Sequence, residues 1–247
     1  MQSKTAPFAW TVRTTTHHPP CRLYSATHQL TTLLPIMAAL HGDRAATIMP
    51  PAHSPLAAGR AGSPGGYQIR KGAPGDTRWV VFHQGGGWCV SDESCAARAN
   101  TDLGSSTAGP HKYSWGPTFS DPYEGSQLFQ TPPFDTATLV YALYCDGGSW
   151  AGNAKDPVMA KPNSTAPPQK IWYRGRPLLD ALYDHLLAAG LAQASEFLFA
   201  GCSAGGLTVY IHADYIASRM KKEAPSTTMV ALADAMFSID TPDSQGE

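Results

Sequence analysis

The chain has 247 residues, 43% of them hydrophobic, and its 18 basic side chains nearly balance its 19 acidic ones. This length suits one α/β domain with some additional chain, and the near-neutral charge argues against nucleic-acid binding through a basic surface. The longest apolar run, residues 33–40, contains a proline and is too short to cross a bilayer, which excludes a membrane channel or transporter with an integral span.

The first part of the chain differs in composition from the rest. Residues 1–42 contain no acidic residue, three basic residues and ten serines and threonines, a bias typical of organelle transit peptides. No clear secretory signal is visible, and prolines and glycines continue without helical or strand periodicity to about residue 75. We therefore expect residues 1–54 to be a low-complexity or disordered segment, either a targeting sequence or a gene-model artefact, and residues 55–247 to form the folded domain.

From residue 78 onward, strand-like and helix-like segments alternate. Short apolar runs rich in β-branched and aromatic residues predict four strands, at residues 79–82, 138–144, 197–200 and 229–233, the first of them buried. Apolar residues recurring on one face predict helices over residues 177–190 and 204–222. This order predicts an α/β fold whose mostly parallel sheet carries helices on both faces.

A nucleophile-elbow motif, G-x-S-x-G, lies between the third strand and the second helix. Gly201 and Gly205 flank Ser203, and side chains at the two glycine positions would collide with neighbouring backbone in so sharp a turn. The turn exposes the serine at the carboxyl edge of the sheet, where the helix N-terminus stabilises developing negative charge. On the motif alone, a glycine-rich turn with a capping serine is the alternative interpretation.

An acyl-transfer serine also needs backbone donors for the oxyanion of the tetrahedral intermediate. Ala204, directly after the serine, supplies one N–H, and the glycines at 85–87, after the first strand, supply the others. Loss of one such donor typically lowers the rate by about 10²–10³. A tight turn with no catalytic role is the alternative reading of this glycine loop.

Several motifs together, in this order, resemble the plant-type pectin acetylesterase family, which is related to the animal Notum carboxylesterases. They are Gly85-Gly86-Gly87-Trp88-Cys89, Leu103-Gly104-Ser105-Ser106, Tyr144-Cys145-Asp146-Gly147, Tyr173-Arg174-Gly175, the 201–206 elbow and Ala233-Asp234-Ala235. The resemblance implies an α/β-hydrolase-like fold, a serine nucleophile and no metal or other cofactor. It also implies an extracellular or cell-wall location and, as substrate, an acetylated polysaccharide or another acyl ester.

The resemblance also assigns individual residues. By motif position, Ser203 is expected to be the nucleophile, and Gly86, Gly87 and Ala204 the oxyanion donors. It further supports a disulfide between Cys89 and Cys95.

Two aromatic side chains beside the glycine loop are candidate substrate contacts. Trp88 lies within the loop motif, and its indole suits stacking on a sugar ring, as do Trp150 and Trp172, although tryptophans of this kind are more often core residues. His83 is the histidine nearest the loop in sequence. We expect it to contact substrate, and a role as general base is the less favoured alternative.

Other candidate bases and acids fit the site poorly. His212 follows Ser203 by nine residues on the same predicted helix, which places it about 13 Å along the axis and on the opposite side. His185 falls in the middle of the preceding helix. Asp234 and Asp240 follow the fourth strand, but the resemblance argues against both as the catalytic acid.

The sequence departs from the family pattern at several points. Gln84 is neutral where the family has an acidic residue, and Ala213 replaces a cysteine. The family's catalytic Asp and His lie far beyond the nucleophile, whereas only 44 residues follow Ser203, so we expect the chain to be C-terminally truncated.

The remaining cysteines and one sequon add further possibilities. Cys202 is either a buried thiol or a partner of Cys145, and the cysteine spacing gives little support to a zinc site because no second Cys/His pair follows. The run 163–165 is an N-glycosylation sequon that matters only in a secreted protein.

Three functions follow from these observations. The first is a serine carboxylic-ester hydrolase that removes O-acetyl groups from cell-wall polysaccharide through an acyl-enzyme on Ser203. The second is a Notum-like deacylase for a longer acyl chain. The third is a catalytically incomplete fragment or carbohydrate-binding pseudoenzyme.

Overall fold

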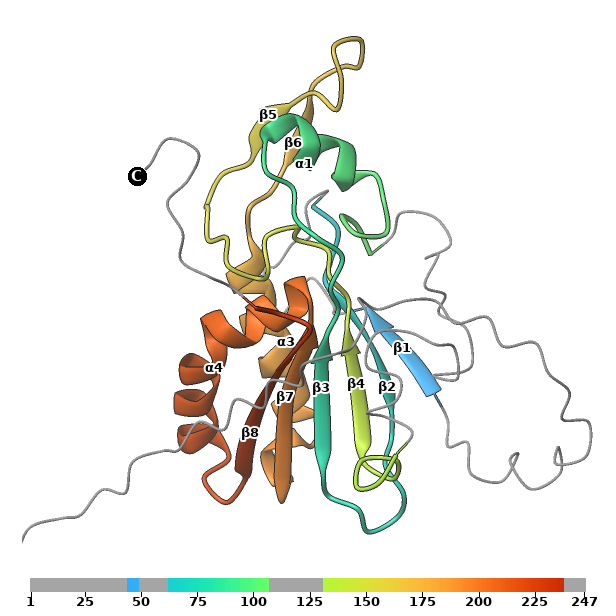
Figure 1. The fold of residues 1–247 in the computed structure, drawn as a ribbon, viewed down its shortest axis with the longest axis vertical. Helices are drawn as coiled ribbons and strands as arrows, with labels where there is room; N and C mark the ends of the chain where they lie inside the picture. Colours follow the sequence, from blue (N-terminus) through green and yellow to red (C-terminus); the bar gives the residue numbers. More distant parts are fainter. Residues whose placement is uncertain (1–43, 49–61, 107–130, 238–247) are drawn as a thin grey trace, which may run out of the picture.

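The computed structural model describes residues 44–48, 62–106 and 131–237, and its main feature is a six-stranded sheet (Figure 1). The spatial order of the strands is β1-β2-β4-β3-β7-β8. They comprise β1 (Arg44–Ile48), β2 (Gly66–Arg70), β3 (Trp79–His83), β4 (Thr138–Ala142), β7 (Glu196–Cys202) and β8 (Thr228–Asp234). Four neighbours, β4, β3, β7 and β8, are parallel, whereas β2 pairs antiparallel with β4 and β1 antiparallel with β2.

The central strands form where the apolar runs predict them. All five residues of β3 and of β4 are buried, as are six of the seven in β7. A strand buried on both faces needs a continuous apolar run rather than an alternating pattern. The predicted α/β fold with a mostly parallel sheet is therefore confirmed.

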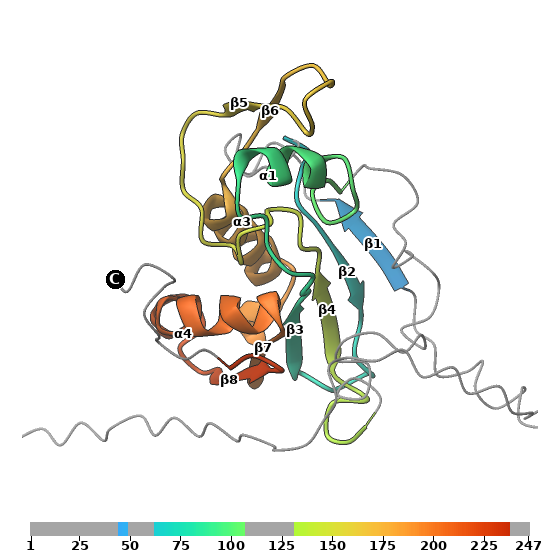
Figure 2. The same cartoon turned by 45° about the horizontal axis from the view of Figure 1, so that its top comes forward.

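Two long helices cover one face of this sheet. The α3 helix (Gly175–Ala188) and the α4 helix (Ala204–Glu223) pack their apolar sides in one cluster with Trp79, Val81 and Phe199 of the strands. A short 3-10 helix, η3 (Leu191–Gln193), follows α3. Figure 2 shows both long helices on the same side of the strands. A second apolar cluster lies on the opposite face of the sheet, and in the described ranges no helix packs against it. The sequence predicts helices on both faces, whereas the described residues show them on one face only.

The N-terminal side of the sheet differs from the sequence prediction. Strand β2 lies in the stretch expected to lack strands up to residue 75, and β1 lies before the domain boundary expected at residue 55. β2 has only five residues, and it begins with a glycine and ends with an arginine. Its apolar content is therefore too low for the sequence to predict a strand there.

A small cap stands beyond the carboxyl ends of the parallel strands (Figure 1). It consists of the α1 helix (Asp92–Ala99) and the antiparallel hairpin of β5 (Val158–Ala160) and β6 (Gln169–Ile171). Cys95, Ala96 and Ala99 of α1 pack against Ala160 and Ile171 of the hairpin in a separate apolar cluster. Among the helices that the structure describes, none combines the length and apolarity needed to cross a membrane.

Candidate active site

Ser203 occupies a strained backbone position between β7 and α4. Its φ is 56° and its ψ is −121°, values that a residue with a side chain seldom adopts. The Ser203 N–H donates to the carbonyl oxygen of Asp234 at 3.0 Å, so the end of β8 braces the turn. The side chain is half-buried. This is the geometry of a nucleophile elbow, in which a sharp strand-to-helix turn presents a serine at the edge of the sheet.

The glycines around this serine are sterically required. A Cβ atom at Gly201 would lie 2.2 Å from the carbonyl oxygen of Gly205. A Cβ atom at Gly205 would lie 1.9 Å from the carbonyl oxygen of His83. Both contacts are with backbone, which cannot rotate away as a flexible side chain can. The collisions expected at these two positions are therefore confirmed.

The glycine loop begins at the same edge of the sheet. His83, the last residue of β3, pairs in register with Gly201 of β7, so the loop after β3 and the elbow after β7 emerge side by side. Gly86 and Gly87 have φ values of 131° and 67°, which favour glycine. A Cβ atom at Gly87 would meet nothing within 4 Å. The backbone in front of this residue is therefore open to a ligand.

Three backbone N–H groups at this edge are available as donors. Within the described ranges, no acceptor is hydrogen-bonded to the N–H of Gly86, Gly87 or Ala204. Ala204 is the first residue of α4, where N–H groups lack partners in the preceding turn and the helix dipole favours negative charge. The arrangement can hold an oxyanion formed on a carbonyl attacked by Ser203.

Gln84, where the family pattern has an acid, ties the start of this loop to β4. Its N–H donates to the carbonyl oxygen of Ala142 at 3.1 Å, and its side-chain oxygen accepts from the Tyr144 N–H at 2.9 Å. The amide oxygen thus makes a contact that a carboxylate oxygen can make as well.

The three tryptophans differ in environment. The side chain of Trp88 is 43% exposed beside the glycine loop, and its indole N–H donates to the Ser149 hydroxyl oxygen at 2.8 Å. Trp150 is buried in the core, and Trp172 stacks on the guanidinium group of Arg174 at 3.9 Å. A sugar contact through Trp88 stays a prediction, whereas the core alternative holds for Trp150.

The side chain of His83 lies inside the core. It is fully buried, its Nδ1–H donates to the carbonyl oxygen of Ala200 at 2.9 Å, and its ring packs against Phe199, Trp150 and Tyr183. Burial lowers the pKa of this imidazole to about 4, so it is neutral at pH 7. The substrate contact expected of His83 does not fit this placement, because side chains alternate along β3 and this one shares the helix-covered face with Trp79 and Val81.

The other described histidines also lie away from the elbow. His212 is buried against the loop after β4, and its Nε2–H donates to the carbonyl oxygen of Trp150 at 2.9 Å. His185, on α3, lies 3.3 Å through Nδ1 from the Tyr67 hydroxyl. Asp234 is exposed at the end of β8, and Asp240 lies outside the described residues. Among the described histidines, none hydrogen-bonds to Ser203.

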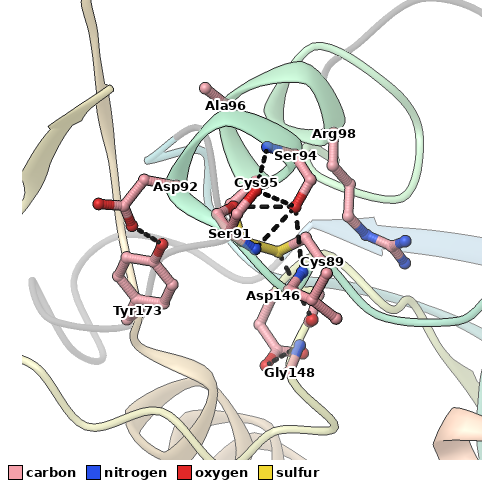
Figure 3. The surroundings of a disulfide bond; sticks show 12 residues. Cys89, Ser91, Asp92, Ser94, Cys95, Ala96, Arg98, Asp146, Gly148 and Tyr173 are labelled. Carbon is pink, nitrogen blue, oxygen red and sulfur yellow. Dashed lines mark hydrogen bonds between the residues drawn. A yellow bond between two sulfur atoms is a disulfide. The ribbon is translucent and has the colours of Figure 1, made fainter. Parts of the chain in front are cut away.

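A disulfide fixes the chain just after the glycine loop. Cys89 and Cys95, which lie six positions apart in the sequence, form a disulfide, as the family resemblance predicts (Figure 3). The Cys89 N–H donates to the carbonyl oxygen of Gly147 at 3.2 Å, which ties the same point to the loop after β4. The disulfide therefore anchors α1 to the edge of the sheet that carries the elbow.

Local polar contacts define the start of α1. Ser91 and Ser94 form a reciprocal capping box, in which each side chain accepts from the other's backbone N–H. Asp92, in the first turn, accepts from the Tyr173 hydroxyl at 2.5 Å, so the helix is joined to the segment leaving β6.

The two other described cysteines are not bonded to each other. In the described ranges neither Cys145 nor Cys202 forms a disulfide, both are buried, and burial raises the pKa of the Cys145 thiol to about 12. Of the two possibilities for Cys202, the buried thiol is the one observed. The part of the chain that the structure describes holds no group of three or more His, Cys, Asp or Glu side chains arranged for a metal.

Sequence reasoning missed one residue of this region, Ser149. It is buried in the loop after β4 and contacts both the glycine loop and the elbow through its hydroxyl. Its φ of 51° gives no signal in the sequence, because serine is not a residue that marks left-handed backbone.

Comparisons with known proteins agree with this geometry. The model of the family described as Pectinacetylesterase matches residues 39–247. Pectin acetylesterase 5 from Arabidopsis thaliana is 35% identical over 187 residues, covering 75% of this chain and 40% of that protein. Palmitoleoyl-protein carboxylesterase NOTUM from Mus musculus is 31% identical over 182 residues, covering 72% of this chain and 33% of that protein.

The chain thus spans less than half the length of these curated relatives. Its match to the family model nevertheless includes β1 to β8, the glycine loop, the disulfide and the elbow. The chain belongs to the pectin acetylesterase family, which is related to the Notum carboxylesterases.

Proposed function

We propose that the chain supplies the nucleophile, Ser203, of a serine carboxylic-ester hydrolase that removes O-acetyl groups from cell-wall polysaccharide. The observation that carries this proposal is the strained backbone of Ser203, held between glycines whose replacement the neighbouring backbone forbids. Strain of this kind persists only where the surroundings enforce it, and it clusters at functional sites.

In the proposed reaction, the Ser203 hydroxyl oxygen attacks the acetyl carbonyl carbon and its proton passes to a general base. The carbonyl oxygen becomes an oxyanion, and the N–H groups of Gly86, Gly87 and Ala204 donate to it. The oxyanion collapses and the bond from its carbon to the sugar oxygen breaks. This oxygen takes the proton from the base and leaves as a hydroxyl, and an acetyl group stays on the serine. Water attacks this acyl-enzyme and releases acetate.

The proposal requires a base that the described residues do not provide. A general base acts within about 2.6–3.2 Å of the hydroxyl, or through one water. His83, His185 and His212 each bond elsewhere, so the imidazole has to come from outside the described ranges. Because the chain covers less than half of these relatives, the source of the base is the main point to test.

Two features support a polysaccharide ester and an extracellular site of action. The exposed indole of Trp88 beside the glycine loop offers an apolar ring face on which a sugar can stack. The disulfide between Cys89 and Cys95 is typical of proteins that fold in an oxidising compartment.

Turnover of p-nitrophenyl acetate by the purified chain tests the proposal, with Ser203→Ala as control. We expect hydrolysis that the substitution abolishes, and an octanoate ester measured in parallel separates an acetylesterase from a deacylase for longer chains. Turnover equal in the two proteins would refute catalysis by this chain.

The absence of a described imidazole near Ser203 favours one alternative, a carbohydrate-binding protein without catalysis. Titration calorimetry with acetylated pectin oligosaccharides distinguishes the two. Binding by both the parent and Ser203→Ala, without ester hydrolysis by either, would support the alternative.

A further inference from the structure

Ser149 lies in an unusual stretch of backbone after β4. It is 1% exposed, and it and Trp150 have φ values of 51° and 60°, two left-handed residues in succession without a glycine. The Asp146 carboxylate holds this backbone by accepting from the N–H groups of Gly148 and Trp150 at 3.1 and 3.0 Å. The serine is therefore placed by its surroundings rather than by its own preference.

The Ser149 hydroxyl joins the two sides of the candidate oxyanion site. Its oxygen accepts from the Trp88 indole N–H at 2.8 Å, and its own proton goes to the carbonyl oxygen of Ala204 at 2.8 Å. Its backbone N–H donates to the Tyr144 hydroxyl oxygen at 3.1 Å. One hydroxyl thus acts as acceptor toward the glycine loop and as donor toward the elbow.

We propose that Ser149 is a positioning residue that fixes the spacing between the loop donors, Gly86 and Gly87, and the elbow donor, Ala204. The inference deepens the proposed function and rests on it for its catalytic consequence. Without the hydroxyl, Trp88 loses its acceptor. Gly86 and Gly87, whose N–H groups have no acceptor in the described ranges, then lose this hydrogen-bonded link to α4.

The first test needs no turnover. Ser149→Gly removes only the side chain, because glycine adopts positive φ without penalty. By ¹⁵N NMR, we expect faster exchange of the Trp88 indole proton and lower order parameters at Gly86 and Gly87, with Gly75, in a distant turn, unchanged. Unchanged values at all three site positions would overturn the inference whether or not the chain is active.

A second variant protects this test against a folding defect. Trp88→Phe removes the same hydrogen bond from a half-exposed position and keeps an aromatic ring. We expect it to lower the order parameters of Gly86 and Gly87 as Ser149→Gly does. If neither variant changes them, the hydrogen bond does not position the loop.

The catalytic arm separates positioning from binding. Because oxyanion donors act in the transition state, we expect Ser149→Gly to lower kcat by about 10- to 100-fold and to leave KM nearly unchanged. A raised KM with an unchanged kcat would contradict positioning. Absence of Ser203-dependent turnover in the parent refutes the proposed function, and the NMR result then decides the structural inference alone.

A second, independent observation concerns the tip of the cap hairpin. Asn163 is exposed in the loop between β5 and β6, and Asn163-Ser164-Thr165 is the single Asn-x-Ser/Thr sequence in the chain. Its Oδ1 accepts from the Thr165 N–H at 3.0 Å, the Thr165 hydroxyl at 2.9 Å and the Ala166 N–H at 2.8 Å. In the described ranges nothing accepts from its Nδ2, which leaves this nitrogen available.

We infer that Asn163 is an N-glycosylation site. In this reaction, Nδ2 bonds to the anomeric carbon of a lipid-pyrophosphate-linked oligosaccharide, the bond from that carbon to the phosphate oxygen breaks, and the nitrogen loses one proton to the transferase. The loop between β5 and β6 extends away from the sheet (Figure 1).

Secretion of the full chain behind a cleavable signal peptide tests this site. We expect one glycan, whose removal by peptide N-glycosidase increases electrophoretic mobility and converts the asparagine of this peptide to aspartate in the mass spectrum. Asn163→Gln and Thr165→Ala are expected to abolish the modification, and Thr165→Ser to retain it. A secreted, disulfide-bonded chain with an unmodified Asn163 would refute the inference.

Discussion

Two glycines show that similar substitutions act through different physics. Gly205 lies in the first turn of α4, where its backbone conformation suits alanine, but a Cβ atom there would meet the backbone of His83 at 1.9 Å. Gly75 lies in an open turn with a φ of 86° and nothing within 4 Å of its Cβ direction. The first position forbids a side chain because of a neighbour, the second because of its own dihedral angle.

These positions give a matched pair of variants. We expect Gly205→Ala to lower the free energy of unfolding by at least about 3 kcal/mol, because β3 and α4 must separate. For Gly75→Ala we expect a loss of about 1 kcal/mol, from left-handed backbone alone. Urea unfolding followed by circular dichroism measures both, and equal losses would show that α4 relaxes away from β3 at little cost.

The buried imidazole of His83 links stability to pH. Burial lowers its pKa from 6.5 to about 4, so at pH 5 the folded protein keeps the ring neutral while the unfolded chain binds a proton. The stability from this group is present above pH 6.5 and is lost as the pH falls toward 4. Burial shifts the pKa of His212 in the same direction.

His83→Asn isolates this effect, because the amide keeps a donor for the carbonyl oxygen of Ala200. Between pH 7 and pH 5, we expect the parent to lose about 2 kcal/mol more unfolding free energy than the variant. His212 is present in both proteins, so its contribution cancels in the difference. Parallel pH profiles would show that the ring is protonated in the folded state.

At the scale of elements, α1 depends on local links more than on the main core. It has eight residues, and its apolar contacts are with the cap hairpin rather than with the sheet. The disulfide joins its buried Cys95 to the chain that leaves the glycine loop. Loss of this bond should therefore affect the cap and the loop before it affects the strands.

Replacing both Cys89 and Cys95 with serine tests this dependence. We expect about 2 kcal/mol less stability, since the bond restricts a short loop in the unfolded chain. Hydrogen exchange followed by mass spectrometry should show lost protection in α1, with β3 and β7 still protected. Protection that falls equally in all three elements would show that the cap and the sheet unfold together.

The sequence predicts some elements well and others poorly, for physical reasons. Strands β3, β4 and β7 are buried on both faces, so their apolar runs are unmistakable. The hairpin strands β5 and β6 have three residues each, and α1 is set by its capping box and disulfide rather than by apolar periodicity.

The candidate site divides in the same way. The elbow and the glycine loop carry signals in residue identity, because their backbone geometry demands glycine. The burial of His83 follows from the alternation of side chains along β3, which puts it on the same face as Trp79 and Val81. Its nearness to the glycine loop in sequence instead favours a substrate contact, which is why the sequence prediction differs from the structure. Ser149 depends on tertiary hydrogen bonds that no local pattern encodes.

At the scale of the whole molecule, the sheet is unevenly protected. Strand β8 is last in the strand order and pairs with β7 on one side, and in the described ranges no strand pairs with its other side. Val230, in the middle of β8, is 57% exposed, and Phe237, beyond its end, is 76% exposed. Unpaired backbone beside exposed apolar side chains is a template for pairing with another chain.

Val230→Lys tests whether this edge makes the chain self-associate. A lysine there replaces an exposed apolar side chain with a charge that disfavours edge-to-edge pairing, so we expect less concentration-dependent association. Thr228→Lys is the matched control, because it adds the same charge to the same strand at an exposed residue that is not apolar. Sedimentation velocity over a range of concentrations should show more monomer for Val230→Lys than for Thr228→Lys. Equal gains would assign the effect to net charge, and no gain in either would show that this edge does not drive association.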